Sequence, residues 1–338
     1  MRTDMPACIR VPKKDGEKVR ADLLAKGMLD LRRKIGSDEN SIIIPILGDE
    51  YEGYETIEAE LEPLAQTPTD YKDVLEVPEE LRHELPTSFD VIGDVAIIKV
   101  PDVLTEYKHQ IGAAVISVNT SIRIVMMDSG VKGDLRIREL EKIAGEGTPE
   151  TVHREFGVRM AVDPSKVYFN PRLATERMRT ASLVKDGETI IDMFAGVAPF
   201  GMVICKRARP KIVYSIDINP EAERFVRRNM ELNHVENIVP ITGDAADAVN
   251  DLPEADRVIM NLPQIADTFL PIALSKTKIG GTIHLHKISE RSDLEDLADK
   301  MKRDAATGGF EITIGAITEL KTYSPSMSVY VLDIKKEQ

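Results

Sequence analysis

The sequence predicts an α/β protein whose C-terminal half forms a Rossmann-like, mostly parallel sheet, preceded by two smaller α+β domains. Residues 189–199, which read TIIDMFAGVAP, join a short β-branched strand to a small-residue turn and then to the start of a helix. Residues 310–319 and 328–334 alternate apolar and polar side chains as an antiparallel hairpin does, so the sheet should be mixed. Between these two regions, helical patterns, notably 221–233, separate apolar strand-like runs at 212–216, 237–242, 257–260 and 281–285.

The turn after the first strand has the composition of a nucleotide pocket. The strand 189–192 ends at Asp192, and Ala195 and Gly196 let the backbone approach a ligand closely. Pro199 suits the first turn of a helix, where its missing N–H would be unpaired in any case. Twenty-one residues after Gly196, the next strand is followed by Asp217, whose carboxylate can accept both ribose hydroxyls of an adenosine.

Polar residues also follow the later strands, at Asp244 and Asn261, where open α/β sheets bind their ligands. The turn lacks the three-glycine fingerprint of dinucleotide-binding proteins and the Lys-Ser/Thr pair of triphosphate-binding loops. An adenosine ligand without phosphate groups fits better, and S-adenosylmethionine is the cofactor we expect. An ordinary tight strand-to-helix turn is the alternative that the turn alone leaves open.

Composition and charge bound the class of protein. The 338 residues suffice for two or three hydrophobic cores. The formal charge of −13 argues against nucleic acid as a partner of the whole chain, but residues 10–34 hold nine basic side chains against four acidic ones. That cluster indicates either a nucleic-acid contact or a solvated helix. Cys8 and Cys205 lack metal or redox spacing, and no apolar run spans a membrane, so we expect a cytoplasmic protein with reduced thiols.

Four segments are expected along the chain. Residues 1–62 read as a small N-terminal domain, 63–87 as a proline-rich linker, 88–166 as a middle domain and 167–338 as the sheet domain. Within the first three segments, the patterns predict helices over 17–34 and 106–118 and strands over 41–47, 95–100, 122–127 and 152–162.

Six motifs spread over the chain carry a family resemblance: GDLRIRELEKIAGE (133–146), HREFG (153–157), VYFNPRLATER (167–177), DMFAGVAPF (192–200), DINP (217–220) and NLP (261–263). Together they resemble the archaeal and eukaryotic type of tRNA (guanine-N1)-methyltransferase, a class I family that acts at position 37 of tRNA. The resemblance covers essentially the whole chain. YFNPR and NLP are its more specific parts, because many class I methyltransferases share the DMFAG turn. Ala198 departs from the pattern, since glycine is expected there.

The resemblance implies a class I methyltransferase domain with a mixed seven-stranded sheet, a small N-terminal domain that touches tRNA, and a middle domain that closes over the reacting base. It implies that Glu176 is the general base for the N1 proton, that Arg136 stabilises charge developing on O6, and that Asn261 reads the purine edge. S-adenosylmethionine would contact Asp192, Phe194, Ala195, Gly196, Asp217, Ile218, Asp244 and Asn261. The RNA would contact Tyr168, Asn170, Arg172 and Pro263. The partner implied is tRNA, and we expect a monomer without a metal ion.

Each of these residues also has a structural alternative. Glu176 could form surface ion pairs with Arg172, Arg177 and Arg179, which lie nearby in the sequence. Arg136 could be a solvated arginine in a charged stretch, and Tyr168 could belong to the core.

Two histidines, His284 and His286, alternate on a strand. A metal site would need a third ligand, and none is apparent, so a structural role is favoured.

Two other functions compete with methyl transfer. An aminocarboxypropyl transferase of the wybutosine pathway would use the same cofactor but transfer its other alkyl arm. A non-catalytic RNA-binding protein would keep only the fold. The NLP motif and the segment around Glu176 favour methyl transfer, and the joint presence of Glu176, Arg136, Asp217 and Asn261 disfavours a non-catalytic protein.

Overall fold

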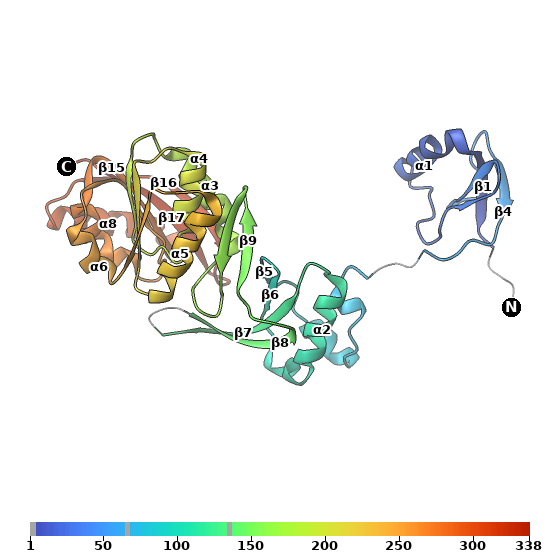
Figure 1. Cartoon of the computed structure of the whole chain (residues 1–338), viewed down its shortest axis with the longest axis horizontal. Coiled ribbons are helices and arrows are strands. Elements are labelled where there is room, and N and C mark those ends of the chain that lie inside the picture. The colour runs from blue at the N-terminus through green and yellow to red at the C-terminus, as the bar shows by residue number, and fades with distance from the viewer. Residues whose placement is uncertain (1–4, 65–67, 134–136) are drawn as a thin grey trace. The chain divides into compact units, whose positions relative to one another are not determined.

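The computed structural model describes residues 5–64, 68–133 and 137–338, which divide into two compact units, one up to Asp73 and one from Val74 to Gln338 (Figure 1). The first unit is a four-stranded antiparallel sheet in the order β2-β3-β1-β4, with one helix, α1 (Gly16–Ala25). Its core contains Ile9, Val11, Leu23 and Ile44. The strands are β1 (Ala7–Pro12), β2 (Gly36–Ser37), β3 (Ser41–Pro45) and β4 (Glu55–Glu58).

The helix expected over 17–34 is wrong at its C-terminal end. Helix α1 ends at Ala25, and Gly27 follows with a φ of 67°, the left-handed conformation that typically terminates a helix. Leu31, which the helical spacing places inward, is 57% exposed. The helical spacing of apolar residues in the sequence therefore continues beyond Gly27, where the helix has already ended.

The second unit begins with a four-stranded sheet in the order β5-β6-β7-β8, in which only β6 and β7 run parallel. Helix α2 (Lys108–Val118) packs against β7 and β8, and Val95, Ile97, Ile124 and Met126 are buried. The strands are β5 (Asp90–Ile92), β6 (Val95–Ile98), β7 (Ile124–Lys132) and β8 (Ile137–Gly145).

The single strand expected over 152–162 is instead a hairpin. Strands β9 (Thr151–Glu155) and β10 (Val158–Val162) pair antiparallel across the two residues Phe156 and Gly157. Both turn residues have positive φ, 47° and 79°, as a two-residue hairpin turn requires. The apolar residues on either side of the turn look continuous in the sequence, which conceals the turn.

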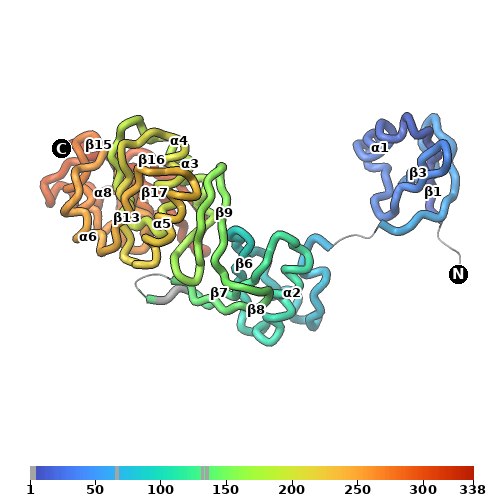
Figure 2. Tube along the Cα trace, in the orientation of Figure 1, coloured from blue at the N-terminus to red at the C-terminus, as the bar shows by residue number. Residues whose placement is uncertain are grey.

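The predicted mixed seven-stranded sheet is confirmed, in the order β13-β12-β11-β14-β15-β17-β16. The first five strands in this order run parallel, and β17 runs antiparallel to both of its neighbours. The course of the chain through the sheet can be followed in Figure 2. The strands are β11 (Thr189–Asp192), β12 (Ile212–Asp217), β13 (Ile238–Thr242), β14 (Ala255–Met260), β15 (Thr277–Glu290), β16 (Ile312–Thr322) and β17 (Met327–Lys336).

Two hydrophobic clusters cover the two faces of this sheet. One contains Phe200 of α4 (Pro199–Arg207) and Phe225 of α5 (Pro220–Asn233). The other contains Leu270 of α7 (Leu270–Ser275) and Met301 of α8 (Leu294–Thr307). None of the helices in the described ranges is long and apolar enough to cross a membrane. The other two α-helices of this region are α3 (Ala174–Leu183) and α6 (Ala245–Ala248).

Candidate active site at the carboxyl edge of the sheet

The turn between β11 and α4 is tightly built. Gly196 has a φ of 53°, and a Cβ atom there would lie 3.2 Å from the carbonyl oxygen of Tyr168. Ala198 is buried with a φ of 57°, a left-handed conformation that costs a non-glycine residue about 1 kcal/mol or more. Pro199 takes the first position of α4, as expected. Backbone strain of this kind clusters at ligand-binding sites.

Asp192 ends β11 in an environment that does not favour a negative charge. It is 1% exposed, and neither carboxylate oxygen has a hydrogen-bond partner among the residues that the structure describes. Burial raises the pKa of Asp192 to about 8; the backbone N–H of Phe194 opposes this shift, and the charge of Asp217 adds to it. A buried carboxylate without partners is rare, and a cationic ligand beside it would relieve the penalty.

Asp217, at the end of β12, holds the turn in place. Its Oδ2 accepts a hydrogen bond from the Gly196 N–H at 2.6 Å, and its Oδ1 accepts one from the Asn219 N–H at 2.9 Å. Burial raises the pKa of Asp217, although the two backbone hydrogen bonds oppose the shift. Each oxygen keeps a second lone pair that can accept a ribose hydroxyl.

The surrounding residues supply apolar surface and one further carboxylate. Phe194 packs edge-on against Phe269, with ring centroids 5.1 Å apart, and Ile218 is 46% exposed. Asp244 follows β13 and accepts a hydrogen bond from the Ala246 N–H, which caps α6. An apolar surface beside a buried carboxylate, Asp192, and a half-buried one, Asp217, fits a ligand that carries an adenosine and a cationic centre. S-adenosylmethionine has both.

Glu176 lies in the first turn of α3 and is 4% exposed. Of the ion pairs considered as the structural alternative, the one with Arg179 is present, but Glu176 is not at the surface. Its Oε2 accepts from Nε of Arg179 at 2.7 Å, and its Oε1 accepts from Nη2 of Arg179 at 2.9 Å and from the Thr180 hydroxyl at 3.0 Å. Glu176 is therefore a buried carboxylate in a bidentate ion pair.

Asn170, which precedes α3, and Arg177, which belongs to α3, are both buried. Arg177 is 1% exposed and makes two hydrogen bonds of 2.6 Å to Glu155 and one of 3.1 Å to the Asn170 carbonyl. The Asn170 side chain accepts a hydrogen bond from the Arg172 N–H. Both side chains are engaged in holding the chain between β10 and α3, and Tyr168, in the same segment, is half-buried.

Arg172 links α3 to the four-stranded sheet. Its Nε donates to Asp90 at 2.7 Å, and Arg138 donates to Asp90 at 3.2 Å and to Asp128 at 3.1 Å. These four side chains border a cavity of about 310 Å³, together with Lys99. Arg136, the expected O6 stabiliser, lies outside the described residues.

The NLP motif follows β14 directly. Asn261 is half-buried, and the Pro263 carbonyl accepts a hydrogen bond from the Ile288 N–H at 3.0 Å. This bond fixes the motif to β15, the strand that carries His284 and His286. Both ring nitrogens of His286 are buried without a hydrogen-bond partner in the described part of the chain.

Sequence reasoning missed a chain of half-buried and buried polar side chains that continues from Glu176. Arg179 pairs with Asp333 of β17, Asp333 contacts Nδ1 of His284 at 2.6 Å, and Nε2 of His284 lies 2.6 Å from Nη1 of Arg257. Asp333 lies 154 positions beyond Arg179, so no local pattern could have joined them. Within the described ranges, no group of three or more His, Cys, Asp or Glu side chains could hold a metal ion.

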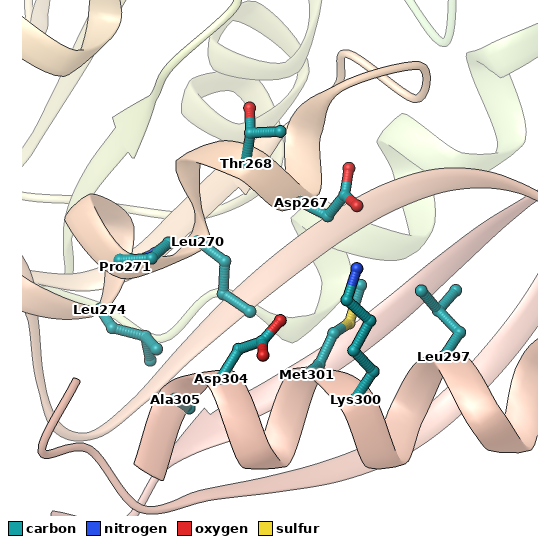
Figure 3. A pocket seen from close by; sticks show the side chains of 10 residues that line it. All are labelled: Asp267, Thr268, Leu270, Pro271, Leu274, Leu297, Lys300, Met301, Asp304 and Ala305. Carbon is teal, nitrogen blue, oxygen red and sulfur yellow. The ribbon is translucent and has the colours of Figure 1, made fainter. Parts of the chain in front are cut away.

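A second cavity, of about 300 Å³, lies between the segment after the NLP motif and α8 (Figure 3). Leu297, Lys300 and Met301 of α8 line one side, and Asp267 and Leu270 line the other. None of the residues expected to bind cofactor or RNA lines this cavity.

Comparison with known proteins agrees with this architecture. The TRM5/TYW2 methyltransferase domain model matches residues 151–313, the TYW2 N-terminal domain model matches 71–148, and the tRNA methyltransferase 5 N-terminal domain model matches 8–55.

Three relatives illustrate the range of the similarity. Trm5b of Pyrococcus abyssi, a tRNA (guanine(37)-N(1))-methyltransferase, is 40% identical over 98% of this chain and 99% of its own, and its crystal structure superposes with a TM-score of 0.85 over 99% and 100% of the two chains. The structure of aTrm5 in complex with tRNALeu has a TM-score of 0.80 at 32% identity, over 98% and 99% of the chains. A tRNA(Phe) (4-demethylwyosine(37)-C(7)) aminocarboxypropyltransferase of Methanocaldococcus jannaschii is 29% identical over 74% of this chain and 98% of its own. This protein is an enzyme of the TRM5/TYW2 methyltransferase family.

Proposed function

We propose that this enzyme transfers the methyl group of S-adenosylmethionine to N1 of guanosine 37 in tRNA. The observation that carries the proposal is the similarity to P. abyssi Trm5b, which extends over essentially the full length of both chains. The complex of aTrm5 with tRNALeu supports tRNA as the partner.

The nearest alternative is transfer of the aminocarboxypropyl arm of the same cofactor. The M. jannaschii enzyme with that activity aligns over almost all of its own length, yet about a quarter of this chain has no counterpart in it. This chain also carries a segment, 8–55, that matches the Trm5 N-terminal domain. Both observations favour methyl transfer.

The cofactor would lie against the carboxyl ends of β11 and β12. Bound there, S-adenosylmethionine supplies an electrophilic methyl group on a sulfonium centre. Gly196 leaves room for close approach to the backbone, and Asp217 can accept the ribose hydroxyls with its remaining lone pairs. Asp192 would face the cationic part of the ligand, because a neighbouring positive charge stabilises a carboxylate that the protein leaves without a partner.

Methylation at N1 of guanine requires removal of a proton, because N1 is protonated at neutral pH. In our proposal a carboxylate oxygen of Glu176 takes that proton, and the nitrogen lone pair forms the bond to the methyl carbon. The bond from that carbon to sulfur breaks at the same time, its electron pair stays on sulfur, and S-adenosylhomocysteine would leave. Negative charge develops on O6 during this step, and Arg136 would stabilise it. Asn261, Tyr168, Arg172 and Pro263 would position the base and the neighbouring RNA.

The test uses single-turnover transfer from cofactor labelled separately in its methyl and aminobutyrate carbons to unmodified transcript tRNA. We expect methyl label alone in the RNA, at N1 of guanosine 37. Glu176→Gln keeps the shape of the side chain but cannot accept the proton, so the rate should fall roughly 10²- to 10⁴-fold with cofactor affinity nearly unchanged.

Glu231→Gln is the matched control, because it makes the same change at an exposed position of α5 and should leave the rate unchanged. Aminobutyrate label in the RNA would replace the proposed reaction with the alternative one. A near wild-type rate for Glu176→Gln at neutral pH would remove Glu176 as the proton acceptor while leaving the overall reaction intact.

A further inference from the structure

Arg179 lies between two carboxylates. It makes two hydrogen bonds to Glu176, and it donates from Nη1 to Oδ2 of Asp333 at 2.8 Å and from Nη2 to Oδ1 at 3.0 Å. One guanidinium is thus bidentate to both side chains, which come from α3 and from β17. Bidentate pairing of this kind fixes the plane of all three groups.

The protonation state of His284 follows from its two partners. Arginine has only donors, so the 2.6 Å contact from Nη1 of Arg257 requires a lone pair on Nε2 of His284. The ring proton must then lie on Nδ1, which donates to Oδ1 of Asp333 at 2.6 Å. His284 is therefore neutral, and burial, the main cause, also lowers its pKa. Glu188 in turn pairs with Arg257 at 2.9 and 3.0 Å.

These contacts leave Glu176, Arg179 and Asp333 with one positive and two negative charges. A proton added to Glu176 leaves a neutral Arg179–Asp333 pair, so the half-buried guanidinium is never without a counter-ion. Asp333 keeps its charge: burial would raise its pKa, but hydrogen bonds from His284 and Arg179 hold that pKa well below its usual range.

Other groups near Glu176 add no further charge to this set of two carboxylates and one arginine. His286 of β15 interacts electrostatically with Glu176, but burial lowers its pKa to about 4, so it is neutral at physiological pH. Phe200 of α4 packs edge-on against the His286 ring, with centroids 5.8 Å apart. On α3 itself, Thr180 contributes a neutral hydroxyl and Arg177 is paired with Glu155.

We propose that Asp333 is a positioning residue for the methyl-transfer step: it shares Arg179 with Glu176, so that Glu176 can take up the N1 proton without leaving the half-buried guanidinium unpaired. The inference rests on the proposed role of Glu176 as the base. Without the carboxylate of Asp333, Arg179 would pair with Glu176 alone. Glu176 would then bind Arg179 too strongly to act as an effective base.

Asp333→Asn tests this inference. The amide keeps an acceptor for Arg179 and His284 but removes the charge. At saturating tRNA and S-adenosylmethionine, the rising limb of the single-turnover pH–rate profile should move to lower pH by about one unit or more, because an unshared arginine favours the ionised form of Glu176. The plateau rate should fall on the order of tenfold, because a weaker base accepts the proton less readily.

The double variant Arg179→Met/Asp333→Leu moves the profile in the opposite direction. It removes the cation together with its second partner and fills the space with apolar atoms, which buried ion pairs often tolerate. Glu176 then lacks its counter-ion, so the rising limb should move to higher pH. This variant also keeps the inference testable if Asp333→Asn fails to fold.

The control is Asp256→Asn, which changes a carboxylate that also pairs with a cation, Lys278, at 2.9 Å and accepts from the Thr189 N–H at the start of β11. Its pH profile should match that of the wild type. The role of Asp333 alone would be overturned if the rising limb of the pH–rate profile stayed at its wild-type position in both Asp333→Asn and the double variant while Glu176→Gln lost most of its rate. Retained rate in Glu176→Gln would instead overturn the base assignment on which the inference depends.

Discussion

Asp192→Asn should stabilise the ligand-free enzyme at pH 8 while weakening its affinity for S-adenosylmethionine. Native Asp192 keeps a proton up to a pH of about 8, whereas an unfolded aspartate loses it near 3.9. The native state therefore binds the extra proton between these values, and its stability falls as the pH rises through that interval. At about 1.4 kcal/mol per pKa unit, the buried carboxylate destabilises the fold by up to about 5 kcal/mol at pH 8.

An asparagine removes this dependence on pH but still leaves a buried amide without partners, which offsets about 1–3 kcal/mol. The remaining gain, on the order of 2–4 kcal/mol, corresponds to a Tm higher by roughly 5–10 °C at pH 8. At pH 5 the difference from the wild type should be much smaller, because the native carboxyl group is already protonated there. Thermal unfolding at both pH values measures the effect, with the exposed Asp186→Asn as the control.

The affinity for the cofactor should depend on pH in the opposite way, rising over the pH range in which stability falls. If a cationic group of S-adenosylmethionine lies beside ionised Asp192, wild-type affinity should rise by up to tenfold per pH unit toward pH 8, and the rise should disappear in Asp192→Asn. Calorimetry at pH 6, 7 and 8 provides the measurement. A Tm difference of equal size at pH 5 and pH 8, or an unchanged pH dependence of binding in the variant, would refute this account of Asp192.

Three further predictions concern the cofactor, the RNA and the fold. Asp217→Ala should weaken cofactor binding by about 1.5–3 kcal/mol, and an unchanged calorimetric affinity would remove Asp217 from the site. Deletion of residues 1–62 should weaken tRNA binding and flatten its dependence on salt, since fewer counter-ions are released; an identical slope in filter-binding titrations would contradict this. Glu155→Gln should destabilise the enzyme by about 3–5 kcal/mol because it leaves Arg177 buried without its counter-ion, whereas Glu223→Gln, which breaks an accessible pair with Arg227, should cost less than 1 kcal/mol in the same denaturant titration.

The parallel strands were predictable because each contains a short apolar run, which is almost fully buried in β11 and β14. The predicted bounds of β11, 189–192, are those of the structure, and β12 and β13 differ by one residue. Strand β8 gave no such signal, because only Ile143 of its nine residues is buried and four of the nine are charged. Local hydrophobicity therefore located the strands of the large sheet and missed a strand that is half-exposed.

Some contacts of the candidate site could also be predicted from the sequence, and others could not. The turn at Gly196 and the carboxylates Asp192 and Asp217 follow one another along the chain, so their proximity could be inferred from strand order alone. The burial of Glu176 and its link to Asp333 could not, because they depend on where β17 inserts in the sheet. A side chain that contributes charge from the far end of the sequence has no local pattern to mark it.

The interior position of β17 has a consequence for the order in which the enzyme acquires activity. This strand fits between β15 and β16, and the contact from Arg179 to Asp333 closes a loop of 154 residues. Contacts of such long sequence separation form late, because the entropy of closing the loop must be offset before they gain anything. During refolding, helices and the first parallel strands can therefore appear well before Arg179 finds its second partner. We expect a kinetic lag between recovered secondary structure and recovered methyl transfer, so that partly assembled molecules bind no tRNA productively and cannot modify it.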